Sequence, residues 1–342
     1  MIRLTDSYRD FEPVAEEWLD MVDAFLDKGD RILRMINNVI NYKFRIKESR
    51  SEGLDEEDKK LGVFLLIFYK ANLRYFVLAN NEELLTISKF YEKWMAAGSR
   101  KLHKCLQDIF EKAYNDFRKT NPKSLVRESE GNKFKESKVA YHFFKRLNVR
   151  TCPYCNRQYT FTISSKTANT SPEYDHFYDK AEFPILALSF YNLVPSCHTC
   201  NHIKGKKRLS VNPYFEEIKG EFVIINSKNQ EEITDPLLLR ENEWKLTWKS
   251  DTKYIHDNIQ NLGLDLLYAE HTDYIDEIAG KVQAYNSCAK ESLVSSFQGP
   301  GKSAQDVENF VWGPYIDRAK FKERPLSKLT HDILKEFKVI PK

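Results

Sequence analysis

Four of the six cysteines in this 342-residue chain form two Cys-x-x-Cys pairs. We call Cys152-Pro-Tyr-Cys155 the first knuckle and Cys197-His-Thr-Cys200 the second knuckle, because each places two thiolates on one tight turn. Two such turns can close a tetrahedral zinc shell with four sulfur ligands. Since four sulfurs leave no open coordination position, this zinc would be structural and would contribute folding free energy to a module with little core of its own.

The same four cysteines could instead be unrelated buried thiols or a redox pair. The paired spacing favours zinc over both. The six cysteines are also too few and too clustered for a disulfide framework in a chain of this length. Cys105 and Cys288 stand alone, and we expect both to be ordinary core residues.

A second group of polar residues lies between and just after the knuckles. Asp175 and His176 are adjacent, Asn192 follows in the next apolar run, and Asn201 comes directly after the last cysteine. Neighbouring residues of a regular strand point to opposite faces, so Asp175 and His176 can serve one site only at a bulge or a strand end. The oxygen atoms of Asp175 and Asn201 suit a hard cation such as Mg²⁺. His176 would then be neutral and free to accept a proton, since an unperturbed imidazole titrates near pH ~6.5.

Together these residues resemble the HNH nucleases of the ββα-metal superfamily, in the subgroup whose fold is held by a four-cysteine zinc. The resemblance covers residues 152–205. It lies in the spacing of three features: the adjacent Asp and His, the Asn between that pair and the second knuckle, and the segment Cys-x-x-Cys-Asn-x-x-Lys-Gly. It implies that His176 is the general base, that Asn192 orients His176, and that Asp175 and Asn201 hold a catalytic Mg²⁺ or Mn²⁺. The implied activity is that of a DNA endonuclease, which hydrolyses phosphodiester bonds and leaves 5′-phosphate and 3′-hydroxyl ends.

Two histidines beside this motif allow more than one interpretation. Many HNH nucleases carry His where this chain has Asn201, and His202 follows directly. The resemblance to the asparagine-bearing members favours Asn201 as the ligand and leaves open whether His202 joins the metal site. His198 and His202 are four residues apart, so they share a helix face, and we interpret them as a solvated or phosphate-facing pair.

Positive charge is concentrated around the same residues. Ten Lys/Arg and four Asp/Glu lie between Tyr141 and Ser210, whereas the rest of the chain has 43 basic and 46 acidic residues. This local excess indicates a polyanionic partner, for which we expect DNA. The motif is followed by a basic run that suits the phosphate backbone, which carries no sequence information, so we expect weak sequence specificity. Its members are Lys204, Lys206, Lys207 and Arg208. Without the motif, such a run would be interpreted as a solvated helix end.

The elements that must position these residues fall into three stretches. Residues 1–138 repeat apolar residues at helical spacing and predict an N-terminal helical bundle. Residues 139–213 predict the HNH ββα-metal nuclease module with its four-cysteine zinc. Residues 214–342 predict strands at 222–225 and 244–248 and helices at about 262–285 and 328–337, in a mostly helical α+β region that regulates or binds a partner. The expected fold class is therefore mainly α and multidomain, with one small zinc-stapled α+β module.

Several classes of protein are excluded by composition. With 42% hydrophobic and 30% charged residues, the chain is neither disordered nor fibrous. Its longest apolar run, Leu61–Tyr69, is about half the length that crosses a bilayer, so we expect no membrane span. The first residues lack the basic start and apolar stretch of a secretory signal, which predicts a cytoplasmic location.

Aromatic residues at helical spacing in the bundle are interpreted as core. They are Phe64, Phe68, Tyr69, Tyr75 and Phe76.

Two flanking segments add a looser resemblance. Residues 258–264 and 324–329 resemble parts of HNH nucleases from bacterial antiphage systems of the Septu type, which implies an ATPase partner.

Two other classes of function compete with a nuclease: a non-catalytic zinc-knuckle module that binds nucleic acid or protein, and a scaffold built around a decayed nuclease. A binding module explains the cysteines and the basic excess but has no need for Asp175, His176, Asn192 and Asn201 together.

Overall fold

The computed structural model describes residues 2–4, 8–47, 50–126, 134–165, 167–250, 253–285, 287–298 and 303–341. Within these ranges the chain is mainly helical and every sheet has two strands, which confirms the predicted mainly α class. No helix in these ranges is long and apolar enough to cross a membrane.

The N-terminal part of the chain is a bundle of helices. Polar side chains cap the helices that begin at residues 81 and 100: Asn80 and Glu83 form a capping box, and the Ser99 hydroxyl accepts a bond from the Leu102 amide. A small hairpin interrupts the helices. The elements are α1 (Glu12–Asp27), α2 (Arg31–Ile40), β1 (Lys43–Lys47), β2 (Arg50–Gly53), α3 (Glu56–Ala71), α4 (Leu73–Val77), α5 (Asn81–Met95) and α6 (Arg100–Lys119).

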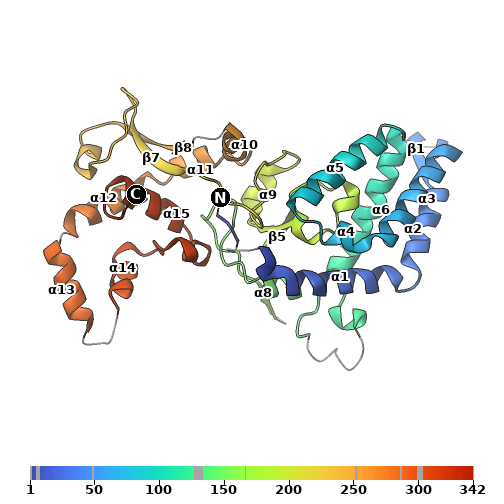
Figure 1. The fold of residues 1–342 in the computed structure, drawn as a ribbon, viewed down its shortest axis with the longest axis horizontal. Helices are drawn as coiled ribbons and strands as arrows, with labels where there is room; N and C mark the ends of the chain where they lie inside the picture. Colours follow the sequence, from blue (N-terminus) through green and yellow to red (C-terminus); the bar gives the residue numbers. More distant parts are fainter. Residues whose placement is uncertain are drawn as a thin grey trace.

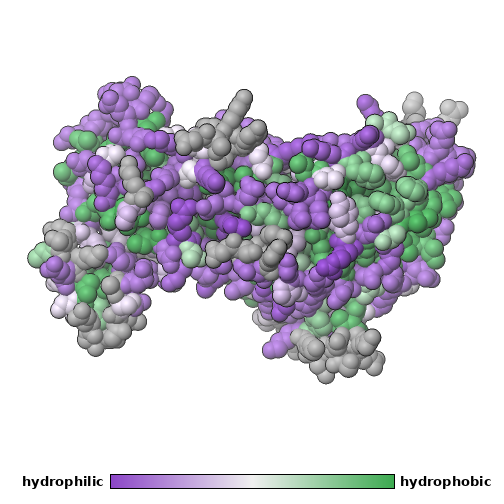
Figure 2. All heavy atoms as spheres, in the orientation of Figure 1, coloured by the Kyte–Doolittle hydropathy of each residue, from purple (hydrophilic) through white to green (hydrophobic). Residues whose placement is uncertain are grey.

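One face of the bundle is apolar and exposed, which the sequence did not predict. Phe64 is 57% exposed, Tyr75 40% and Phe68 37%, whereas Tyr69 and Phe76 are buried. The interpretation of all five as core is therefore wrong for three of them, because helical spacing alone does not show how wide the covered stripe is. Figure 2 shows hydrophobic residues gathered on the bundle's side of the molecule.

The middle of the chain holds two antiparallel strands followed by a short helix. Strands β5 (Glu173–His176) and β6 (Leu193–Ser196) pair with His176 opposite Leu193, and α9 (His198–Lys204) follows β6 directly. Asn192 lies in a 3₁₀ turn (Phe190–Asn192) directly before β6. Other elements here are α8 (Val139–Leu147), β3 (Ile163–Ser164) and β4 (Asn169–Thr170).

The C-terminal part packs a hairpin against helices. Its strands, β7 (Glu221–Asn226) and β8 (Trp244–Lys249), match the strands predicted at 222–225 and 244–248, and they pair in antiparallel register. The helix expected at about 262–285 is divided, because a turn at Glu270 and His271 separates two helices. The helices are α10 (Lys253–Asn261), α11 (Leu264–Ala269), α12 (Thr272–Ala284), α13 (Ser287–Gln298), α14 (Ala304–Trp312) and α15 (Ser327–Glu336).

The three parts share a continuous hydrophobic core that runs from Leu4 to Phe337. Trp18 of α1 is one junction, because its indole nitrogen donates a 2.9 Å bond to the Leu188 carbonyl and its ring packs against Phe143 and Phe190. Figure 1 shows the bundle at one end, the C-terminal helices at the other, and β5 and α9 between them. The bundle is therefore placed to form part of any site at β5 and α9.

Candidate functional site

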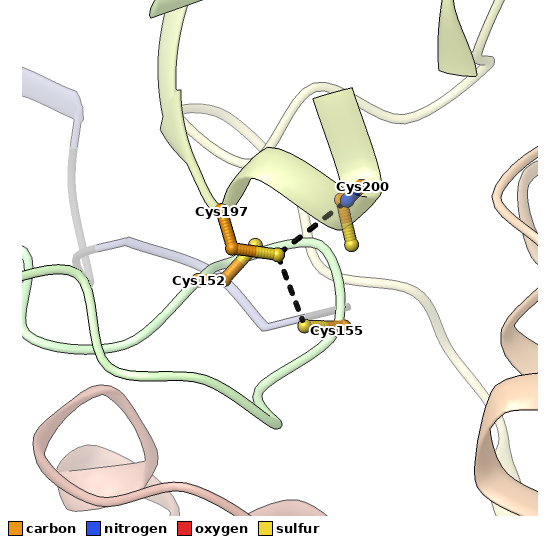
Figure 3. A group of neighbouring side chains, drawn as sticks. All are labelled: Cys152, Cys155, Cys197 and Cys200. Atoms are coloured by element: carbon orange, nitrogen blue, oxygen red, sulfur yellow. Dashed lines mark hydrogen bonds between the residues drawn. The ribbon is translucent and has the colours of Figure 1, made fainter. Parts of the chain in front are cut away.

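The four cysteines of the two knuckles converge as predicted. All four are buried and their sulfur atoms lie within 4.8 Å of one another. The Cys155 and Cys197 sulfurs are 3.9 Å apart, which matches the ~3.8 Å between ligands of a tetrahedral zinc with 2.3 Å bonds. Figure 3 shows the side chains pointing toward a common centre. The donor set therefore fits a metal ion such as zinc.

Local backbone geometry presents these sulfurs. The Asn156 amide bonds to the Cys152 carbonyl at 2.7 Å and closes the turn of the first knuckle. Cys197 is the N-cap of α9, and its sulfur accepts a bond from the Cys200 amide. Hydrogen bonds from Cys152 and the other two thiols hold the pKa of Cys197 below its ordinary value. Zinc binds cysteine in its thiolate form.

The two lone cysteines differ from each other. Cys105 is fully buried in α6, as expected, and burial raises the pKa of its thiol to about 12. Cys288 is exposed, so the expectation that it belongs to the core is wrong. Among the described residues, the knuckle cysteines form the one group of three or more Cys, His, Asp or Glu ligands close enough to share an ion.

Asp175 is buried between two hydrogen-bond donors. One carboxylate oxygen accepts a 2.6 Å bond from the Tyr154 hydroxyl, and the other lies 3.1 Å from the Lys204 ammonium. Burial raises the pKa of Asp175 above its ordinary value, while Lys204 and Tyr154 oppose that rise. Asp175 therefore already has a cation beside it.

Lys204 was predicted to belong to a basic run that binds phosphate, and its position in the structure contradicts that prediction. Its side chain is fully buried, and the ammonium also donates a 2.7 Å bond to the His176 carbonyl. Lys204 therefore faces inward and is not part of an exposed phosphate-binding surface. No local pattern indicated this, because the contact joins residues that are distant in the chain.

His176 is the last residue of β5, which is the strand end that the Asp-His pair requires. Its Nε2 lies 3.1 Å from the Ala187 carbonyl oxygen. A carbonyl only accepts, so Nε2 carries the hydrogen and Nδ1 is the basic nitrogen. Burial, with Lys180 adding to it, lowers the pKa of His176 to about 3, below the ordinary value expected from sequence. The ring of Tyr114 packs edge-on against the imidazole, with 4.7 Å between the two ring centres, and contributes to that burial.

Asn192 is completely buried and holds the loop that carries Ala187. Its amide oxygen accepts a 2.7 Å bond from the Tyr178 amide, and its nitrogen donates to the carbonyls of Tyr178 and Leu186. Leu186 directly precedes Ala187, whose carbonyl oxygen accepts the hydrogen bond from His176. Asn192 therefore braces the segment that fixes the imidazole.

Glu173 is a site residue that the sequence analysis missed. One of its carboxylate oxygens accepts a 2.6 Å bond from the Asn201 amide nitrogen, and the other lies 3.0 Å from His198 Nδ1. The sequence feature that could have identified Glu173 is its position two residues before Asp175, which places both residues on the same side of a strand. His198 and His202 share an exposed helix face as predicted, with ring centres 5.8 Å apart.

Asp175, His176 and Asn201 all line one pocket of about 690 Å³. Glu173 and Asp179 add acidic groups to its lining. Five cationic residues outnumber the three carboxylates, which favours a bound anion over a free cation. The cationic residues are Arg118, Lys119, Lys138, Lys180 and Lys206. Arg118 and Lys119 come from α6, so the bundle contributes a wall that the motif spacing alone did not indicate.

The rest of the basic run is divided between the pocket and the surface. Lys206 lines the pocket. Lys207 donates a 3.1 Å bond to the Asn261 carbonyl, away from the pocket lining. Arg208 pairs with Glu92 at 2.8 Å and Glu182 at 3.2 Å, so its charge is already matched. Lys206 is thus the member of the run best placed to meet a phosphate at this site.

The predicted divalent ligands do not fit an ion in their present arrangement. Both oxygens of Asp175 accept bonds, and the Lys204 ammonium already supplies the positive charge. Asn201 is held by Glu173 through its amide nitrogen. A divalent ion placed at Asp175 would face like-charge repulsion from Lys204.

Comparisons of the chain with models of known families, with curated proteins and with solved structures find no match. The four-cysteine cluster occurs in many kinds of protein, so by itself it does not identify a nuclease. The resemblance of residues 152–205 to HNH nucleases therefore stays a prediction from the sequence.

Proposed function

We propose that this protein is an HNH-type endonuclease that hydrolyses phosphodiester bonds of DNA. The observation that carries the proposal is the state of His176 in the cationic pocket. Its Nε2 is engaged by the Ala187 carbonyl, which leaves Nδ1 as the basic nitrogen of a neutral ring. Nδ1 can accept a proton from water, and the cationic residues of the pocket can hold a phosphate beside it, although burial and those cations weaken the imidazole as a base.

In the proposed reaction, His176 Nδ1 removes a proton from water and the resulting hydroxide attacks phosphorus in line. The new oxygen–phosphorus bond forms as the bond to the 3′ oxygen breaks, and the 3′ oxygen takes a proton from solvent. Arg118 and Lys206 stand in the pocket lining where they can offset phosphate charge. A phosphate beside the ring also stabilises protonated His176, which opposes the effect of burial on its pKa.

No step of this mechanism is assigned to a divalent ion, because Asp175 is occupied by Lys204 and Tyr154 in this structure. When bound, such an ion would supply charge stabilisation at the phosphate oxygens. The resemblance to Septu-type nucleases leads us to include an ATPase partner and a role in antiphage defence in the proposal.

One observation favours a second candidate, a zinc-knuckle module that binds nucleic acid without cutting it. Asp175 is fully satisfied by internal partners, as a purely structural carboxylate would be. Under this alternative the cationic pocket would still bind DNA, but His176 would have no role in chemistry.

The test of the proposal compares cleavage and binding in the same proteins. Purified wild-type protein and His176→Ala are incubated with plasmid DNA in the presence of Mg²⁺ or Mn²⁺, and DNA binding is followed by fluorescence anisotropy. We expect His176→Ala to bind DNA normally and to lose at least 100-fold in cleavage rate, as removal of a general base does. Equal cleavage by both proteins, or binding with no cleavage by either, contradicts the proposal. Unchanged zinc content shows that the variant is folded.

A further inference from the structure

Two exposed aromatic side chains lie stacked on the chain just after the first knuckle. The ring centres of Tyr159 and Phe161 are 4.5 Å apart, and the ring planes differ by 20°. Tyr159 is 49% exposed, Phe161 44% and Ile163 49%. They alternate along the chain with the buried Thr160 and the half-buried Thr162. Adjoining exposed apolar side chains mark an interaction site more often than single scattered ones do.

The backbone holds these rings in place. Tyr159 forms an antiparallel bridge with Thr151, and the Thr160 amide donates a 2.9 Å bond to the Arg150 carbonyl. The Thr160 hydroxyl donates a further 2.8 Å bond to the Val149 carbonyl. A ligand that stacks on the rings therefore meets a surface that is already ordered, which reduces the entropy cost of binding.

The charge around the rings suits a polyanion. Residues 149–172 contain three Lys or Arg and no Asp or Glu. The Arg150 guanidinium lies 5.6 Å from the centre of the Phe161 ring, and its ion pair with Glu323 is 3.4 Å long and partly exposed. Since exposed ion pairs contribute little, Arg150 can turn toward a phosphate at small cost. Aromatic faces beside cations bind unpaired bases, because the bases stack on the rings while the cations meet the phosphates.

A short path joins the rings to the cationic pocket. Ile163 of β3 pairs with Thr170 of β4, and the next two residues, Ser171 and Pro172, line the pocket. From the length of an extended residue and the spacing of paired strands, the backbones of Phe161 and Ser171 lie within about 17 Å of each other. A DNA strand with one phosphate in the pocket can therefore reach the rings with nucleotides a few positions away.

We infer that Tyr159 and Phe161 form a stacking platform for unpaired bases of a DNA strand whose phosphates occupy the cationic pocket. A duplex offers no free base faces along its length, because its bases already stack on one another. The preferred ligand is therefore DNA with a single-stranded stretch beside the bound phosphate. This role rests on the function proposed for the pocket, but it concerns the form of DNA that binds and not its cleavage.

The test compares binding of a single-stranded oligonucleotide and of a blunt duplex of the same length, followed by fluorescence anisotropy. The parent protein is the zinc-loaded full chain with His176→Ala, which keeps the DNA intact under the proposed mechanism. Tyr159→Ala and Phe161→Ala, each added to the parent, should weaken single-strand binding roughly fivefold or more, as loss of one base–aromatic stack does. Duplex binding should stay unchanged.

Two further variants separate stacking from other effects. Tyr159→Phe keeps the ring and should bind single strands as the parent does. Phe64→Ala removes an exposed ring that is also stacked on a neighbouring ring but lies in α3 of the bundle, so it should bind normally. Because all the substituted side chains of these variants are exposed, we expect each protein to keep its zinc.

A direct signal of stacking comes from 2-aminopurine, a base analogue whose emission falls when it stacks on an aromatic ring. An oligonucleotide with this base between thymines should lose emission when saturated with the parent and keep it when saturated with Tyr159→Ala/Phe161→Ala. Equal single-strand affinities in the parent and the alanine variants, no single-strand binding by the parent, or the same emission in both complexes overturns the inference.

The proposed function and the stacking platform can fail separately. Ring-dependent binding of single strands by a protein that never cuts DNA when His176 is restored contradicts the proposed function alone. Cleavage by that protein, combined with alanine variants that bind single strands as the parent does, contradicts the platform alone.

Discussion

The Tyr154 hydroxyl donates a 2.6 Å hydrogen bond to the buried carboxylate of Asp175. Tyr154 lies between the two cysteines of the first knuckle, so the candidate zinc centre and the candidate pocket share a direct contact. On the other side of the carboxylate, Lys204 extends from the helix that the second knuckle begins. Both knuckles therefore help to place Asp175, and loss of the metal should disturb the pocket as well as the fold.

The first prediction concerns zinc. We expect purified protein to contain about one zinc ion per chain, and Cys197→Ser to lose it, because three remaining sulfurs hold the ion far less tightly. Structural zinc contributes several kcal/mol to folding, so the variant should lose at least ~3 kcal/mol of unfolding free energy. Elemental analysis and urea denaturation measure the two effects.

Cys288→Ser is the matched control for this experiment, because Cys288 is exposed and lies outside the cluster. It should keep both its zinc and its stability. Wild-type protein that folds normally after complete chelation of zinc would contradict a structural metal.

The second prediction concerns Tyr154→Phe, which removes one hydroxyl and leaves the ring in place. Asp175 then loses one of its two donors, and an incompletely satisfied buried carboxylate costs ~1–3 kcal/mol. We expect a stability loss of that size with unchanged zinc content, and slower DNA cleavage because Asp175 is less firmly placed. Tyr214→Phe is the control: its hydroxyl donates to the Leu193 carbonyl at 3.1 Å, away from the pocket lining.

Tyr214→Phe should lose comparable stability and keep the wild-type cleavage rate. If both tyrosine variants lose cleavage equally, Tyr154 has a general structural role and no specific link to the pocket.

The third prediction concerns Asn192→Ala. The change removes three hydrogen bonds from the loop that presents the Ala187 carbonyl, so His176 loses its fixed orientation. We expect a stability loss of ~2 kcal/mol or more and a larger relative loss of cleavage. The comparison is Asn212→Ala, because Asn212 is equally buried and also bridges backbone groups, the Tyr191 carbonyl and the Tyr214 amide, but makes no bond to Tyr178 or Leu186. Similar cleavage rates in the two variants would argue against the bracing role.

Local spacing made some features predictable. Cys-x-x-Cys fixes each pair of sulfurs on one turn, and the apolar run at 222–225 and the alternation at 244–248 indicated strands β7 and β8. The requirement for a bulge or a strand end at Asp175 and His176 also followed from strand geometry alone. In each case the relevant partners lie close in sequence or obey a simple period.

Contacts between distant residues could not be predicted in the same way. Lys204 belongs to an exposed-looking basic run, yet its ammonium is buried because Asp175 offers it a partner across the β5–α9 junction. Arg118 reaches the pocket only because α6 packs beside β5, and no local signal marks it. The exposed Phe64 shows the opposite case, in which a regular apolar period extends beyond the covered face.

The last prediction concerns Asn156, which joins the first knuckle to the C-terminal part of the chain. It is buried, its amide nitrogen donates to the Phe321 carbonyl at 2.8 Å, and its amide oxygen accepts from the Lys328 amide at 3.0 Å. Its backbone is left-handed, with φ of 49°, a conformation that Asn and Gly tolerate better than Ala. Asn156→Ala should therefore lose the hydrogen bonds and also strain the backbone.

We expect Asn156→Ala to lower the unfolding free energy by ~3 kcal/mol or more and Asn156→Gly to lower it by ~1–2 kcal/mol less, because Gly removes the strain but not the lost bonds. Urea denaturation of both variants gives the two contributions separately. Since the same side chain ties the zinc turn to the segment before α15, both variants should also expose that segment to proteolysis. Equal stabilities for the Ala and Gly variants would show that the left-handed backbone carries no cost, and wild-type stability in both would show that the junction does not depend on Asn156.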